Sequence, residues 1–275
     1  MPSYIYCRNW KDTKLICRLC GDTSSKIFRK KILDKYDVDY FQCSSCQFIQ
    51  TEEPFWLKES YQNSINIEDS GLLDRNILFA KRAATVLYFL FNKRGAFLDY
   101  GGGYGLFVRL MRDHGFDFYW NDPFTENLFA RGFELKVEKQ KRFELVTVFE
   151  CFEHFVDPIA ELERMLLLSD SLLFSTEIFS STAPLPEEWR YYGFSHGQHV
   201  ALYSLKSLEY IAKKYNMHLC TNKKSFHLLT RKKMNNSLFN FLLYAAHFGI
   251  PLIIRSLMHS KVNSDAVEVQ FRGKT

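Results

Sequence analysis

The chain has 275 residues, of which 47% are hydrophobic and 24% are charged. This size and balance suit one large α/β domain with a small additional module, and they exclude a disordered chain, a collagen-like repeat and a disulfide-stapled miniprotein. The formal net charge of +5 is too small by itself to indicate a nucleic-acid binder. The N-terminal residues lack the apolar run of a secretory signal, which predicts a cytoplasmic protein with reduced thiols.

Residues 1–50 predict a small β-rich zinc module. Four of the seven cysteines form two Cys-x-x-Cys pairs, Cys17 with Cys20 and Cys43 with Cys46. In a reducing compartment this spacing favours a metal over disulfides, and four thiolates complete a tetrahedral zinc site. Because such a site leaves no open coordination position, we expect the zinc to be structural rather than catalytic.

The rest of the chain divides into three parts by the spacing of its apolar residues. Residues 51–95 carry apolar side chains at three- and four-residue intervals, which predicts a helical connector. In residues 96–232 short apolar runs alternate with helical segments, and this pattern predicts an α/β domain with a parallel sheet and helices on both faces. Residues 233–275 are expected to form a hydrophobic helical extension.

A glycine-rich turn follows the first apolar strand of the α/β domain. The segment DYGGGYG begins at Asp99 and contains Gly101, Gly102, Gly103 and Gly105. Glycines let the backbone turn sharply and approach a ligand closely, and the next helix offers free N–H groups at its N-terminus. The dinucleotide fingerprint G-x-G-x-x-G fails in both registers, so we expect a different nucleotide-like cofactor.

The pattern acidic-x-G-x-G-x-G resembles the glycine loop of the class I S-adenosylmethionine-dependent methyltransferases. Asp122 and Pro123 match the acidic-Pro pair of that family. Residues 150–158, ECFEHFVDP, are similar to the branch that includes ubiquinone-biosynthesis O-methyltransferases and sugar methyltransferases. The cysteine module resembles one that precedes some sugar C-methyltransferases. The likeness covers roughly residues 96–178, with a weaker likeness beyond.

This resemblance implies a Rossmann-like class I sheet and S-adenosylmethionine as the cofactor. In the usual arrangement Asp99 and the glycines of the loop hold the amino-acid end of the cofactor. Asp122 binds the two ribose hydroxyls, a task that suits the two oxygens of a carboxylate. Glu150 is assigned to the cofactor side as well.

The candidate catalytic residues are His154, His196, His199 and Tyr192. A base is needed only if the acceptor is protonated, and neutral imidazole at His154 or His199 suits the deprotonation of a hydroxyl. Three of the four lie in the loop WRYYGFSHGQH, which is expected over the strand ends. Each histidine could instead be a structural hydrogen-bonding residue, and Glu153 with His154 could simply orient the strand end.

We expect methylation of a small molecule or glycan, such as a sugar or a lipid-linked sugar, with oxygen as the first expectation for the acceptor atom. An RNA or nucleic-acid methyltransferase is the competing enzyme, because a zinc module and the basic stripe from Lys206 to Lys233 could both bind phosphates. However, residues 150–154 lack the Asn/Asp-Pro-Pro-aromatic signature of base methylation. A cofactor-binding scaffold without activity is the remaining alternative.

Residues 237–254 carry no formally charged side chain. Their length reaches the lower limit for spanning a bilayer, but Asn240, Gly249 and Pro251 argue against a simple transmembrane helix. Two interpretations stay open. The segment is buried against the domain or a second subunit in a homodimer, or residues 206–258 contact a membrane surface or lipid carrier.

Overall fold

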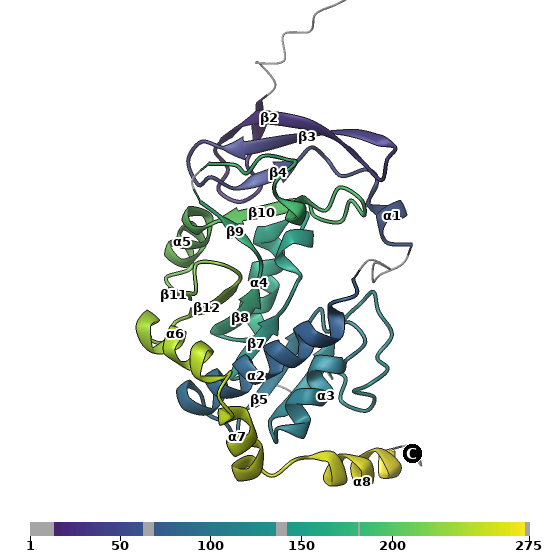
Figure 1. Ribbon diagram of the computed structural model, residues 1–275, viewed down its shortest axis with the longest axis vertical. Coiled ribbons are helices and arrows are strands. Elements are labelled where there is room, and N and C mark those ends of the chain that lie inside the picture. Colours follow the sequence, from purple (N-terminus) through teal and green to yellow (C-terminus); the bar gives the residue numbers. More distant parts are fainter. Residues whose placement is uncertain (1–13, 63–68, 136–141, 181, 273–275) are drawn as a thin grey trace, which may run out of the picture.

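The computed structural model describes residues 14–62, 69–135, 142–180 and 182–272. Within these residues, two six-stranded sheets follow one another along the long axis of the molecule (Figure 1). The N-terminal strands lie at one end, the main sheet lies in the middle, and the C-terminal helices lie at the other end. The chain therefore has the mixed α/β fold that the sequence predicts, with an N-terminal cysteine cluster beside a Rossmann-like sheet.

The first sheet combines N-terminal strands with two strands from the middle of the chain. Its order is β1-β2-β3-β4-β10-β9. The bounds are β1 Lys14–Ile16, β2 Thr23–Ile32, β3 Tyr36–Cys43, β4 Ile49–Thr51, β9 Ile178–Phe179 and β10 Ala201–Ser204. In Figure 1 the purple N-terminal strands lie beside the green β10. Strand β10 pairs antiparallel with β4, so the predicted boundary near residue 50 falls within one continuous sheet.

The main sheet has the order β11-β12-β8-β7-β5-β6. Strands β8, β7, β5 and β6 are parallel, whereas β12 pairs antiparallel with β8 and β11 pairs antiparallel with β12. The bounds are β5 Ala96–Tyr100, β6 Asp117–Asn121, β7 Leu145–Val148, β8 Ser171–Ser175, β11 His218–Thr221 and β12 Phe226–Thr230. Every residue of β7 and β8 is buried, as expected for central strands covered on both faces.

Helices cover both faces of the main sheet because successive strand residues point to opposite sides. Phe97 belongs to the core shared with α2, α3 and α6, whereas Leu98 belongs to the core shared with α4 and α5. Helix α4 begins after Asp157, whose side chain caps the backbone N–H of Ala160. The bounds are α2 Leu72–Leu90, α3 Leu106–Asp113, α4 Pro158–Leu168, α5 Leu205–Lys214 and α6 Asn236–Ala245.

One short helix and two 3₁₀ turns lie outside these two layers. The helix α1 and the 3₁₀ turns η1 and η2 contribute to the loops above the main sheet. Their bounds are α1 Leu57–Ser60, η1 Phe152–His154 and η2 Arg190–Tyr192.

The C-terminal segment forms three helices, α6, α7 (Ile250–Met258) and α8 (Val262–Arg272). Helices α6 and α7 bury one side against α2, with Phe239 and Ile254 in the core. Helix α8 is tied to α3 by a buried pair between Asp265 and Arg112, at 2.7 Å. Among the described residues no single helix is long and apolar enough to cross a membrane. Helices α6 and α7 pass that test only together, with an 89° bend between them.

Candidate active site

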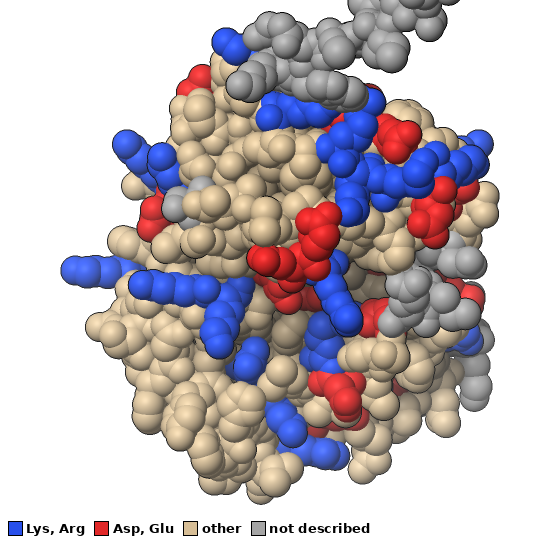
Figure 2. Space-filling view, turned by 45° about the horizontal axis from the view of Figure 1, so that its top comes forward, with Lys and Arg blue, Asp and Glu red and all other residues tan. Residues whose placement is uncertain are grey.

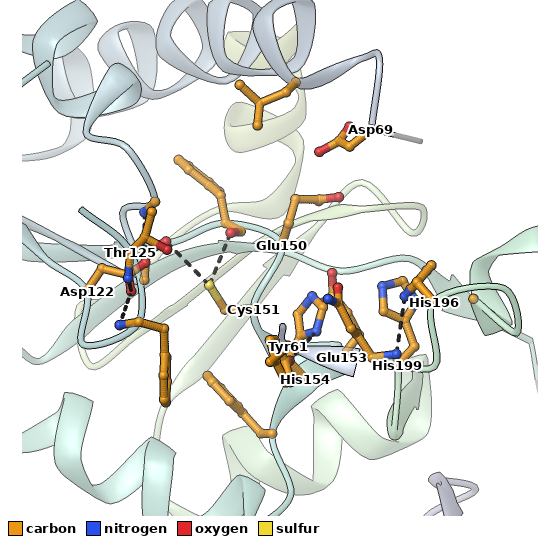
Figure 3. A pocket seen from close by; sticks show the side chains of 18 of the residues that line it. Tyr61, Asp69, Asp122, Thr125, Glu150, Cys151, Glu153, His154, His196 and His199 are labelled. Atoms are coloured by element: carbon orange, nitrogen blue, oxygen red, sulfur yellow. Dashed lines mark hydrogen bonds between the residues drawn. The ribbon is translucent and has the colours of Figure 1, made fainter. Parts of the chain in front are cut away.

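A cavity of ≈ 1380 Å³ opens beyond the carboxyl ends of β5, β6 and β7. Its walls come from the residues that follow these strands, from the loop between β9 and β10, and from the connector around α1 and α2. Open α/β sheets bind their ligands at this edge. In Figure 3, Asp122 lies on one side of Cys151, and His154 and His199 lie on the other. The cavity therefore has a glycine-loop end and a histidine end.

The glycine loop turns sharply between β5 and α3. Gly101 has a φ of +72°, and a Cβ at this position would lie 2.5 Å from the sulfur of Cys151. Gly103 also has a positive φ, of +52°, but a Cβ there would meet no atom within 4 Å. A side chain at Gly103 would thus occupy open space beside the cavity, where a ligand can approach the backbone closely.

Asp122 closes the glycine loop from the end of β6. One carboxylate oxygen accepts a hydrogen bond from the backbone N–H of Gly103 at 2.9 Å. The other accepts from the N–H groups of Phe124 and Thr125 at 2.8 and 3.0 Å. Each carboxylate oxygen has two lone pairs, so a ligand hydroxyl still finds an acceptor on this half-buried group. The assignment of Asp122 to ribose stays a prediction.

Asp99 lies beneath the same loop and is only 3% exposed. Its carboxylate accepts a hydrogen bond from the hydroxyl of Thr147 at 2.6 Å. Burial raises the pKa of Asp99 to about 7, against the opposing effect of the Thr147 hydrogen bond and with a smaller contribution from Asp122. The predicted contact of Asp99 with the amino-acid end of a cofactor stays a prediction.

Glu150 follows β7 and has the unusual φ of +53° for a residue with a side chain. Its carboxylate accepts from the hydroxyl of Ser175 at 2.6 Å and lies 3.7 Å from the guanidinium of Arg75. Burial raises the pKa of Glu150, while Ser175 and Arg75 oppose that rise. Glu150 lines the cavity, and its contact with the cofactor stays a prediction.

His154 lies at the other end of the cavity, in the turn η1 after β7. Its Nδ1 shares a hydrogen bond with the hydroxyl of Tyr61 at 2.9 Å. Burial lowers the pKa of His154 to about 4, and the neighbouring His196 adds to this effect. The ring is therefore neutral at physiological pH and keeps an unprotonated nitrogen.

His199 faces His154, with 5.0 Å between the ring centroids. Its Nδ1 donates a hydrogen bond to the backbone carbonyl of Tyr191 at 2.5 Å. That bond fixes the tautomer, so that Nε2 of the neutral ring carries a lone pair. Burial lowers the pKa of His199 well below its usual value, and the two neighbouring histidines lower it further.

The structure brings His196 to the same end of the cavity, 4.8 Å from His199 between ring centroids. The Nδ1 of His196 accepts a hydrogen bond from the backbone N–H of Gln198 at 3.2 Å. Three of the four predicted catalytic candidates are thus neighbours, although they come from η1 and from the loop before β10.

Tyr192 is placed away from this group. Its side chain is fully buried in the core of the first sheet, stacks against Phe194 and donates a hydrogen bond to the carbonyl of Pro184 at 2.9 Å. Because neighbouring residues of the turn η2 point in different directions, Tyr191 lines the cavity instead. Tyr192 therefore does not line the cavity, whereas the other three candidates do.

Glu153 completes the histidine end and is only 1% exposed. Its Oε2 has no hydrogen-bond partner. Burial raises the pKa of Glu153 to about 8, and the charge of Glu150 adds to this rise. Donor atoms of Glu153, His154 and His199 all lie within 4.8 Å of one another. The sequence left two roles open for Glu153, orientation of the strand end and a place near the substrate, because its burial could not be read from the motif.

The connector also contributes residues to the site, among them Tyr61 after α1 and Arg75 on α2. Neither belongs to a motif, and both reach the cavity only because the connector folds across the strand ends. Only the aromatic, histidine-rich composition of the loop before β10 could have indicated from the sequence that Tyr191 belongs to the site.

The four cysteines of the N-terminal module meet as the sequence predicts. The sulfur atoms of Cys17 and Cys46 are 3.7 Å apart, and those of Cys20 and Cys43 are 3.4 Å apart. All four sulfur atoms lie within 4.8 Å of one another. In a tetrahedral site with Zn–S bonds of about 2.3 Å, the sulfur atoms are about 3.8 Å apart. The tetrad therefore fits zinc with little rearrangement.

Arg18 links the cysteine tetrad to the histidine end of the cavity. Its guanidinium donates to the backbone carbonyls of Thr51, Val156 and Val200 at 3.1, 3.1 and 2.9 Å. The N–H of Val200 in turn donates to the carbonyl of Glu153 at 2.9 Å. The knuckle between the first two cysteines thus ties together the two loops that carry the histidines.

Comparisons with known proteins give one family. Residues 74–221 match a family model described as a methyltransferase domain. A comparison with curated proteins gives no match.

Solved structures with a related fold are distant in sequence. An O-methyltransferase family protein from Burkholderia thailandensis is 12% identical over 66% of this chain and 64% of its own, with a TM-score of 0.47. A methyltransferase of calicheamicin biosynthesis is 12% identical over 64% of this chain and 61% of its own, with a TM-score of 0.41. A protein from Thermotoga maritima, described as a possible histamine N-methyltransferase, is 14% identical over 64% of this chain and 99% of its own, with a TM-score of 0.39. This chain thus spans less than two thirds of the length of the first two.

Proposed function

Because this chain belongs to the methyltransferase-domain family, whose model covers more than half of its residues, we propose that it methylates a hydroxyl group of a small molecule or glycan. The enzyme class, an S-adenosylmethionine-dependent methyltransferase, comes with the family. The acceptor is our proposal. A sugar or a lipid-linked sugar is its preferred form.

The glycine-loop end of the cavity fits the cofactor. The open space above Gly103 admits a ligand against the backbone, and the carboxylate of Asp122 retains lone pairs for hydroxyl groups. S-adenosylmethionine supplies a methyl group already activated on a sulfonium. The protein therefore has to align the acceptor with that methyl group and to deal with the acceptor's proton.

The observation that carries the hydroxyl acceptor is the pair of neutral imidazoles at the opposite end of the cavity. Burial keeps His154 and His199 uncharged, and the carbonyl of Tyr191 leaves the lone pair of His199 on Nε2. Such lone pairs bind a hydroxyl and help remove its proton, either directly or through a bound ion. An acceptor seated there would lie between the histidines and the glycine loop.

A product assay tests this proposal with nucleotide sugars, lipid-linked sugars, quinone precursors and RNA as acceptors. We expect His199→Ala and His154→Ala to retain S-adenosylmethionine binding by calorimetry but to lose turnover by about 100-fold or more, as is typical for a lost acid–base group. Full turnover in both variants would rule out this role of the histidines. Methylation of RNA alone would replace the proposed acceptor by a nucleic acid.

Zinc at Cys17, Cys20, Cys43 and Cys46 forms part of the proposal. Four thiolates give a closed site, so the ion would hold the N-terminal knuckles and supply no catalytic position. The sulfur spacing within the tetrad supports this role.

The exposed side of α6 and α7 supports contact with an anionic lipid surface. Phe241, Tyr244 and Leu252 are 62%, 64% and 70% exposed. No acidic residue occurs between positions 210 and 264, whereas the segment contains lysines and arginines on both sides of the helices. In Figure 2 the lower left of the surface, on the side of these helices, is largely free of charged side chains and has Lys and Arg above it. This contact would bring the enzyme to a lipid-linked acceptor.

A further inference from the structure

We propose that Glu153, His154 and His199 bind a divalent metal ion at the histidine end of the cavity, and that the acceptor binds to this ion through its oxygens. The juxtaposition of two imidazoles and one carboxylate within 4.8 Å carries the inference. The proposed ion is separate from the zinc at the cysteine tetrad. This second site deepens the proposed function. Only the identity of the acceptor rests on that proposed function, and the binding of the ion does not.

The first argument is the state of Glu153. Its carboxylate is buried, lines the cavity, and has one oxygen, Oε2, without a hydrogen-bond partner. A buried polar atom without a partner costs free energy, typically about 1–3 kcal/mol. A cation at this position would satisfy that oxygen and would favour the deprotonated carboxylate over the protonated form.

The second argument is the orientation of the histidines. The Nδ1 of His199 donates to the carbonyl of Tyr191, which leaves Nε2 as a ligand. The Nδ1 of His154 is held by the hydroxyl of Tyr61. A carbonyl partner fixes both the ring and the tautomer of His199, whereas the hydroxyl of Tyr61, which can donate or accept, fixes the ring of His154. Both supporting partners are already in place at this site.

The third argument concerns the type of ion. Imidazole suits first-row transition ions, while a carboxylate also suits harder cations such as Mn²⁺. At metal–ligand distances of about 2.0–2.2 Å, neighbouring ligand atoms are about 3 Å apart, so atoms that lie within 4.8 Å of one another need to close by no more than about 2 Å. Three protein ligands leave open positions toward the cavity, which can take two oxygens of an acceptor such as a vicinal diol or catechol.

Direct metal titration tests the site. Zinc-loaded protein is titrated with Co²⁺, and binding is measured by visible absorption. A second titration uses Mn²⁺, and binding is measured by the loss of the electron paramagnetic resonance signal of the free ion. We expect one further ion per chain, with a Co²⁺ spectrum that lacks the strong thiolate bands of a cysteine site. Because changes to groups that merely support a ligand already weaken binding about 10- to 100-fold, Glu153→Gln and His199→Gln should weaken it by at least that factor.

Glu161→Gln is the matched control. Glu161 lines the same cavity, but its carboxylate is engaged by Tyr100 and Arg164. This variant should bind Co²⁺ and Mn²⁺ like the parent protein. Thermal melting with and without Mn²⁺ separates a lost site from a lost fold, since a folded variant without the site should show no metal-dependent shift of its melting temperature.

Several outcomes would overturn the inference. Binding of neither Co²⁺ nor Mn²⁺ beyond the tetrad would do so, as would equal affinity in the parent and both ligand variants. Methyl transfer at full rate by protein that carries only the tetrad zinc would remove the role of the ion and leave the methyltransferase function intact. A bound second ion without turnover of any hydroxyl acceptor would instead retain the site and contradict the proposed acceptor.

Discussion

Asp99 shows how a single carboxyl group is changed by its place beneath the glycine loop. The side chain is almost fully buried and has the hydroxyl of Thr147 as its partner. Burial penalises the charged form more than this hydrogen bond favours it, and the pKa rises from 3.8 to about 7. The native protein therefore holds this proton more tightly than the unfolded chain does.

This shift predicts a stability effect with a defined sign. In ligand-free protein, the contribution of Asp99 to the free energy of unfolding is fully present below pH 3.8. This contribution is lost as the pH rises through about 7, so Asp99 favours folding least above pH 7. Asp99→Asn should therefore gain stability relative to the parent between about pH 4 and pH 7. The gain should then level off at no more than about 4 kcal/mol. Urea unfolding at several pH values measures it, and a difference independent of pH would contradict the argument.

At the scale of elements, the junction between β4 and β10 joins the cysteine module to the loops that carry the histidines. The pairing of Ala201 with Gln50 places the end of the histidine loop against the N-terminal sheet. Arg18 reinforces this junction through three backbone carbonyls. Two of them belong to Val156 and Val200, which follow closely after His154 and His199 in the chain. The cysteine module is thus connected to the histidine end of the cavity by strand pairing and by the hydrogen bonds of Arg18.

Arg18→Met should lower kcat while S-adenosylmethionine affinity stays nearly unchanged, because the carbonyls lie beside the histidines and not beside the glycine loop. Loss of these buried hydrogen bonds should also cost about 1–3 kcal/mol of stability. Arg18→Lys should recover part of both losses, since one ammonium can serve some of the carbonyls. Single-turnover rates and calorimetry measure the two effects.

The control for this prediction is Arg131→Met, at a side chain that is 65% exposed and paired with Glu126. Such a surface pair contributes little to stability. Equal kcat in Arg18→Met and in the parent would show that the histidine loops hold their position without Arg18. If the cysteine tetrad holds zinc as we propose, removal of that zinc should have the same kind of effect on kcat as Arg18→Met.

At the scale of the whole molecule, the bent pair α6 and α7 leaves large apolar side chains exposed at the end opposite the cysteine module. Large exposed apolar side chains that lie together are typical of interaction sites, which supports the contact that we propose for this pair. The basic residues near the pair favour an anionic lipid surface, to which each contributes about 1 kcal/mol.

Flotation with liposomes measures this contact. We expect the protein to float with vesicles that contain anionic lipid, less with neutral vesicles, and less at high salt. Phe241→Glu and Leu252→Glu should abolish flotation. Leu167→Glu is the matched control, because Leu167 is 78% exposed but lies on α4. Absence of flotation, with a dimer in light scattering that Phe241→Glu dissociates, would assign the surface to a second copy of the chain.

The sequence by itself determined the features that depend on local chemistry. Alternating strands and helices predicted the sheet, since hydrophobic periodicity is a property of each segment. The spacing of the cysteine pairs predicted the tetrad, and the glycines after Asp99 predicted a sharp turn into a helix. These patterns need only neighbouring residues, and the structure confirms the fold and the cysteine cluster.

Tertiary structure alone decided which distant residues share the site. The pairing of β10 with β4 cannot be read from either strand, and it brings the histidine loop over Glu153. Tyr61 and Arg75 enter the cavity from the connector, while Tyr192 turns into the core and Tyr191 does not. The physical reason is that burial and side-chain direction depend on packing between segments far apart in the chain. The pKa values and the unsatisfied oxygen of Glu153 depend on that packing in turn.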